Sequence, residues 1–134
     1  MKIHHFGIAC ENIRKSKKHY EELGFQVASE LITDSDRNLD YLFLKNGEIL
    51  IELISKNDSM LRSDIDIILE QKKIVGNKIY HIGYASTNIE LDVINLVQQG
   101  YKLIKAPSPA IAVDNRRVAF LIHVDLGVVE LVEE

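Results

Sequence analysis

The sequence predicts an α+β fold built from two tandem βαβββ modules, and an internal repeat is the first observation that indicates it. A shift of 76 residues aligns HFGIACENI with HIGYASTNI and places His5 on His81. A second repeated segment, IELI in the first half and VELV in the second, pairs Glu52 with Glu130 at an offset of 78 residues. Each half also shows strand-like alternation on either side of a helical stretch. We therefore infer duplication of one supersecondary unit of about 55 residues.

The first module is expected over residues of about 1–56. Asn12 is a suitable helix N-cap, Gly24 a suitable C-terminal stop, and Asn46-Gly47 a typical hairpin turn. The predicted elements are a strand over 2–10, a helix over 13–23, a strand over 25–32, a polar segment over 33–38, and strands over 39–45 and 48–55.

A connector of about 57–78 and a second module of about 79–134 complete a single domain over 1–134. The spacing of Ile65, Ile68 and Leu69 predicts a short helix in the connector. Both prolines, Pro107 and Pro109, lie in 106–115, where we expect a loop or an irregular sheet edge. The other predicted elements are strands over 79–86, 101–106, 116–124 and 127–133, with a helix over 89–99.

Composition narrows the class of partner. The 134 residues are 46% hydrophobic and 27% charged with a formal net charge of -4, which argues against a nucleic-acid surface. No stretch approaches the roughly 20 apolar residues that span a bilayer, so we expect no membrane partner. The single cysteine, Cys10, lies in an apolar run and excludes an internal disulfide. These features predict a cytoplasmic protein with a buried thiol.

Strand alternation places the repeated histidines among small residues. Gly83 shares the predicted face of His81, as Gly7 shares that of His5, whereas His4 points to the opposite face. This pattern leaves room beside both imidazoles.

Glu52 and Glu130 each lie within an apolar strand, where a carboxylate is costly to bury without a partner. Two imidazoles and two carboxylates, His5, Glu52, His81 and Glu130, make a nitrogen and oxygen set suited to one Ni, Co, Zn, Mn or Fe ion. A single strand histidine is more often structural, and a single glutamate can be an exposed edge residue. The repeat relation among all four favours the metal site.

The same residues carry a resemblance to the vicinal oxygen chelate superfamily, which includes glyoxalase I, methylmalonyl-CoA epimerase, ring-cleaving dioxygenases and antibiotic-resistance proteins. The opening HHFGIACENIRKSKKHYEELGF resembles the family's first strand and helix, and IELIS, YHIGYAST and RRVAFLIHVDLGVVELVEE resemble its later ligand strands. The resemblance covers essentially the whole chain. It implies a curved, cup-shaped, mostly antiparallel sheet and a homodimer.

The resemblance also implies proton transfer next to a metal-bound carbonyl of a small carbonyl or thioester substrate. Glu130 is the expected base, and Glu52 is its partner on the opposite face of the substrate. We expect a lactoylglutathione lyase (glyoxalase I)-like enzyme. The alternatives are epimerisation of an acyl-CoA, as in methylmalonyl-CoA epimerase, and a non-catalytic resistance protein that binds an antibiotic. A dioxygenase ranks last because it typically has a longer chain.

Four further residues are candidates for substrate binding. Arg37, Arg116 and Arg117 precede strands and are suited to an anionic tail, although charged strand starts are common. Asp36 lies near the position of a further acidic residue of the epimerases, or is a solvated turn residue. The chain lacks the His-Pro-Lys that epimerases usually carry before the last strand and has Ile122-His123-Val124-Asp125 there.

Overall fold

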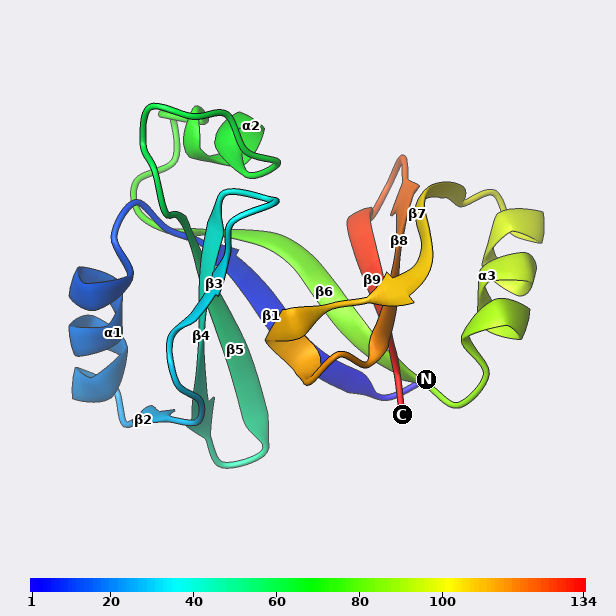
Figure 1. Cartoon of the computed structure of the whole chain (residues 1–134), viewed down its shortest axis with the longest axis horizontal. Helices are drawn as coiled ribbons and strands as arrows, with labels where there is room; N and C mark the ends of the chain where they lie inside the picture. Colours follow the sequence, from blue (N-terminus) through cyan, green and yellow to red (C-terminus); the bar gives the residue numbers. More distant parts are fainter. The chain divides into compact units, whose positions relative to one another are not determined.

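The computed structural model describes residues 1–134 (Figure 1). Its internal contacts divide the chain into two compact units. One comprises Phe6–Tyr80, and the other comprises Met1–His5 together with His81–Glu134. Each half of the chain runs from one strand through a helix to several further strands, in agreement with the α+β prediction. No helix has the length and apolar character that a membrane span requires.

The Phe6–Tyr80 unit is a small mixed sheet covered by one helix. Its central pair is β5 against β4, which run antiparallel around the predicted hairpin, and β1 joins β5 in parallel from Phe6 onward. The short strands β2 and β3 both pair with β4. The strands are β1 (Ile3–Ala9), β2 (Gln26–Val27), β3 (Ile32–Asp34), β4 (Leu39–Asn46) and β5 (Ile49–Lys56).

Helix α1 (Ile13–Glu22) lies beside this sheet (Figure 1). The Asn12 side chain accepts a hydrogen bond of 3.0 Å from the Lys15 amide, which confirms Asn12 as the N-cap. Ile13 joins Ile8 in the unit's hydrophobic core, with the partly buried Phe6 packed against them. The helix therefore packs on the face that strand alternation predicted for Phe6 and Ile8.

The prediction of one continuous strand over 25–32 is wrong. The structure has two short strands, β2 and β3, in its place. The Ala28 amide donates to the Phe43 carbonyl, but the Phe43 amide donates to the Ser29 hydroxyl at 2.9 Å. A side chain thus takes the hydrogen bond that a backbone carbonyl would accept in a regular ladder. The strand is interrupted at this point.

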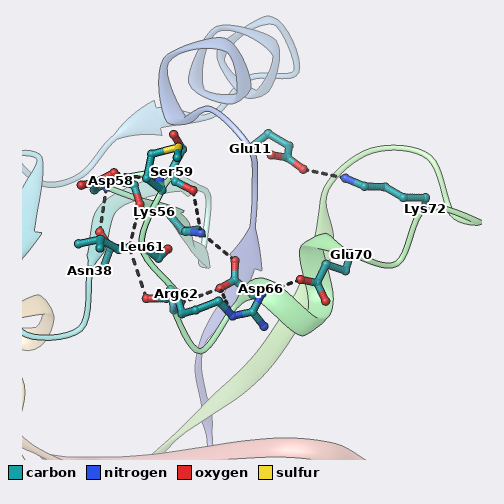
Figure 2. Close-up of polar contacts among 12 residues, drawn as sticks. Glu11, Asn38, Lys56, Asp58, Ser59, Leu61, Arg62, Asp66, Glu70 and Lys72 are labelled. Atoms are coloured by element: carbon teal, nitrogen blue, oxygen red, sulfur yellow. Dashed lines mark hydrogen bonds and ion pairs between the residues drawn. The ribbon is translucent and has the colours of Figure 1, made fainter.

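The connector contains α2 (Asp66–Leu69), as its apolar spacing predicted, and two buried polar residues fix it (Figure 2). Asn38, at φ 57°, donates to the carbonyls of Asp58 and Leu61 at 2.9 and 3.1 Å. It also accepts from the Asp58 amide at 2.8 Å. Asp66 accepts from the Ser63 amide at 2.7 Å and lies 3.0 Å from Lys56 Nζ. The connector is therefore held to its own unit by buried hydrogen bonds.

The second unit is a mixed sheet with α3 (Ile89–Gln98) against it (Figure 1). β9 lies between β6, to which it is parallel, and β8, to which it is antiparallel. The Ala85 amide donates to the Lys2 carbonyl at 2.9 Å, so the N-terminal segment adjoins β6. The strands are β6 (Lys78–Ser86), β7 (Lys102–Pro109), β8 (Arg117–His123) and β9 (Gly127–Glu133).

Strand β7 forms an edge of this unit and is irregular, as the two prolines predicted. Its register against β8 shifts between Leu103 and Lys105 and again between Lys105 and Ser108. The strand nevertheless continues to Pro109, three residues beyond the predicted end, and a short 3-10 helix follows over Ile111–Val113.

Candidate metal centre

Three buried side chains of the Met1–His5 and His81–Glu134 unit converge on one point. His5 Nε2 lies 2.9 Å from His81 Nε2. Glu130 Oε2 lies 3.1 Å from His5 Nε2 and 3.2 Å from His81 Nε2. The three residues come from β1, β6 and β9 and form a group able to hold a metal ion. We refer to them below as the His-His-Glu cluster.

Gly83 makes the space that the cluster occupies. It is paired with Glu130 across β6 and β9, two residues beyond His81 on the same strand face. A Cβ atom at Gly83 would lie 2.5 Å from Cε1 and 2.6 Å from Nδ1 of His5, and 3.2 Å from Oε2 of Glu130. Any larger residue would thus displace the His5 ring. The expectation that small residues leave room beside these histidines is confirmed at this position.

Electrostatics leave the cluster suited to a cation. Burial lowers the pKa of His5 more strongly than the neighbouring Glu130 raises it, so the imidazole is neutral at pH 7. Burial raises the pKa of Glu130, but the two histidines outweigh it and bring the pKa down to about 2. A neutral imidazole and an ionised carboxylate are the forms in which these side chains bind metals.

The residues present fit a divalent ion. Glu130 Oε2 lies in a buried side chain, and the ring nitrogens of His5 and His81 are both close to it. An ion held at about 2.1 Å by ligands at right angles requires ligand atoms about 3.0 Å apart. The three observed separations, 2.9, 3.1 and 3.2 Å, are close to that value. The donor set is the mixed nitrogen and oxygen type that first-row divalent metals accept.

A family model for the glyoxalase/bleomycin resistance protein/dioxygenase superfamily matches residues 4–120. The chain belongs to this superfamily. Its members commonly bind a metal, in agreement with the cluster, although the cluster does not identify the ion. A search of curated proteins found no match.

Solved structures of the superfamily fold are similar over nearly the whole chain. A hypothetical protein, BH1468 from Bacillus halodurans C-125, has a TM-score of 0.83 at 25% identity, with 99% of this chain and 94% of that chain covered. Methylmalonyl-CoA epimerase from Mycobacterium tuberculosis has a TM-score of 0.79 at 21% identity, covering 98% and 87%. A variant of the Streptomyces coelicolor epimerase, in complex with 2-nitronate-propionyl-CoA, has a TM-score of 0.81 at 20% identity, covering 100% and 94%.

Glu52, the remaining predicted metal ligand, belongs to the Phe6–Tyr80 unit. It is buried, with 4% of its surface exposed, in the middle of β5. It pairs with Gly7 on β1 and Phe43 on β4. Its role as a metal ligand stays a prediction.

The candidate substrate-binding residues lie in differing surroundings. Asp36 is exposed in the turn before β4, and Arg37 Nε lies 3.6 Å from Asp34 Oδ2. Arg117 forms ion pairs with Glu133 and Glu90. These ion pairs give Arg117 a structural role. Its part in substrate binding stays a prediction.

Arg116 and His4 form a polar contact that strand periodicity did not indicate. Arg116 Nη2 lies 3.2 Å from His4 Nε2, and His4 Nδ1 lies 2.9 Å from His5 Nδ1. His4 therefore contacts His5 at Nδ1, whereas His5 contacts the rest of the cluster through Nε2. The adjacent His4-His5 pair was the available sequence signal, but its alternation assigned His4 to helix packing. The remaining histidines lie elsewhere, with His19 beside Glu22 and His123 against the ring of Tyr101.

Proposed function

We propose that the chain is a divalent-metal-dependent isomerase that moves a proton on a carbon next to a carbonyl. The observation that carries the proposal is the convergence of two buried imidazole nitrogens and one buried carboxylate oxygen within 3.2 Å. Two imidazoles and one carboxylate that converge in this way make the mixed nitrogen and oxygen donor set that first-row divalent metals accept.

His5, His81 and Glu130 are proposed to hold the ion together with Glu52. The bound metal would act as a Lewis acid that stabilises negative charge developing on a substrate oxygen. The two imidazoles contribute neutral donors, and burial excludes water from their ring nitrogens. Glu130 partly compensates the ion's charge.

The proton is proposed to pass to a glutamate carboxylate. Glu130 takes the proton from the carbon beside the carbonyl, and the electron pair of the broken C–H bond moves toward the carbonyl oxygen. Return of the proton to the neighbouring carbon isomerises a hemithioacetal. Return to the opposite face of the same carbon epimerises an acyl thioester, and Glu52 is the proposed partner for that face. Both outcomes are redox-neutral overall.

Two substrate classes follow from these outcomes. A glutathione hemithioacetal is the class implied by the glyoxalase I-like resemblance. An acyl-CoA thioester is supported by the similarity of the fold to epimerases, one of them bound to an acyl-CoA analogue. Arg37, Arg116 and Arg117 are proposed to contact the anionic tail, and Asp36 remains an acidic candidate nearby. An antibiotic-binding resistance protein ranks lower because it has no need of a buried ligand cluster.

The experiment is a side-by-side assay of metal-loaded protein with methylglyoxal plus glutathione and with a single epimer of methylmalonyl-CoA. We expect turnover of one substrate, dependent on the metal. Glu130→Gln is expected to lower kcat by at least about 100-fold while the protein remains folded. Glu48→Gln, at an exposed turn carboxylate, is the matched control and should retain full activity. Full activity of Glu130→Gln would remove Glu130 as the base.

We also propose that the protein is cytoplasmic and works as a homodimer. Both follow from the composition and the superfamily resemblance. Sedimentation of the purified protein measures the oligomeric state, and a monomer at micromolar concentration would contradict the dimer.

A further inference from the structure

A chain of ring nitrogens connects Arg116 to the His-His-Glu cluster within one unit. Arg116 Nη2 contacts His4 Nε2 at 3.2 Å, His4 Nδ1 contacts His5 Nδ1 at 2.9 Å, and His5 Nε2 contacts His81 Nε2 at 2.9 Å. Each contact is within hydrogen-bonding distance. The arginine is thus linked through two imidazoles to the atom of His5 that lies in the cluster.

Arg116 is held in place from its other side. Its Nε donates to the Val113 carbonyl at 3.1 Å, and its backbone amide donates to the same carbonyl at 3.1 Å. The turn that carries it contains two left-handed residues, Asp114 at φ 57° and Asn115 at φ 60°. The Asn115 amide donates to the Ala110 carbonyl at 3.0 Å, which closes the turn. The guanidinium is therefore directed at His4 by the backbone of its own turn.

The chemistry of the groups fixes where the protons lie. A guanidinium has only N–H donors, so His4 Nε2 must accept. A ring that accepts at Nε2 carries only one proton. Its one proton is then on Nδ1 and points at His5 Nδ1, which must accept. The proton of a neutral His5 is left on Nε2, the nitrogen that a metal would need.

We propose that Arg116 acts through His4 as a latch that holds His5 in the tautomer whose cluster nitrogen is protonated. This inference depends on the proposed metal site. For His5 Nε2 to bind an ion, the His5 proton must move to Nδ1, and His4 must accept there. His4 then carries its proton on Nε2, facing the guanidinium, so the Arg116 contact breaks. Arg116 and His4 are positioning residues in this arrangement.

The latch predicts the sign of the effect of Arg116 on metal affinity. A residue that simply orients a metal ligand strengthens metal binding, and its removal weakens binding about 10–100-fold. Arg116 is predicted to act in the opposite direction. It favours the wrong tautomer of His5, and its positive charge opposes a cation at the cluster. Its removal should tighten metal binding about tenfold.

The first test needs no metal. Histidine ring nitrogen spectra of the metal-free protein, recorded by 15N NMR and assigned with single-histidine variants, report each tautomer. We expect His4 with its proton on Nδ1 and His5 with its proton on Nε2. Addition of Zn²⁺ should move the His5 proton to Nδ1 and the His4 proton to Nε2. A His5 proton on Nδ1 in the metal-free protein would overturn the latch.

The second test measures the Kd for Zn²⁺ by competition with a chelator. Arg116→Met should bind Zn²⁺ about tenfold more tightly than wild type, and Arg14→Met, at an exposed arginine of α1, should match wild type. His4→Gln offers His5 an amide oxygen that accepts without a tautomer change, so it should also bind more tightly. Unchanged or weaker binding by Arg116→Met in a protein that does bind Zn²⁺ would refute the latch alone. No Zn²⁺ binding by any of these proteins would refute the proposed metal site and the latch with it.

Discussion

Substitution of Gly83 by alanine tests the geometry of the cluster through a single methyl group. The added Cβ would lie 2.5 Å from His5 Cε1, whereas carbon atoms in contact normally lie about 3.5–4.0 Å apart. The His5 ring must therefore move by about 1 Å. Metal sites tolerate ligand displacements of only about 0.2 Å. Gly83→Ala should accordingly remove His5 as a ligand and raise the Kd for Zn²⁺ by at least about 100-fold.

The assay is a Zn²⁺ titration against a competing chelator, with thermal unfolding recorded on the same samples. Gly127→Ala is the matched control, since its Cβ would have no atom within 4 Å but the residue has φ 74°. That control should lose about 1 kcal/mol of stability and keep its metal affinity. Wild-type Zn²⁺ affinity in Gly83→Ala would refute the placement of His5 in the metal site. Loss of affinity in both variants would assign the effect to reduced stability.

The buried polar residues of the connector yield two further predictions. Asn38→Ala should lower the free energy of unfolding by about 2–3 kcal/mol, measured by urea denaturation, because it loses its hydrogen bonds and keeps a left-handed backbone. Asn38→Gly should lose less, and equal losses would contradict the backbone contribution. The Ser63 amide and then Lys56 lower the pKa of Asp66 below its ordinary 3.8, so its stabilising effect is complete above that pH and is lost as the pH falls. Asp66→Asn should therefore destabilise the protein at pH 7 and do so progressively less as the pH falls below 3.8, and a loss independent of pH would contradict the ion pair.

The repeat made much of the candidate site predictable. The 76-residue offset identified His5 and His81 as candidate ligands, and the repeated segment IELI and VELV identified Glu130. The structure places one side-chain nitrogen or oxygen atom of each of these three residues within 3.2 Å of the others. Strand alternation predicted correctly that a small residue, Gly83, would leave room beside the histidines. These successes depend on strands, in which side-chain direction follows directly from position.

Contacts that depend on irregular backbone were not predictable. The break in the strand over 25–32 arises because the Ser29 hydroxyl, rather than a carbonyl, accepts from the Phe43 amide. The His4 contact arises because the left-handed residues Asp114 and Asn115 turn Arg116 toward it. Neither arrangement has a periodicity. Alternation alone therefore assigned His4 to helix packing and did not indicate its contact with Arg116.

Metal content of the purified protein tests the central claim most directly. After removal of bound ions and reloading with Zn²⁺, Co²⁺ or Ni²⁺, elemental analysis of the desalted protein should give one divalent ion per chain. His81→Ala, which removes one of the two imidazoles, should retain far less. An ion-free wild-type protein after reloading, or an equal ion content in wild type and His81→Ala, would contradict the proposed metal centre.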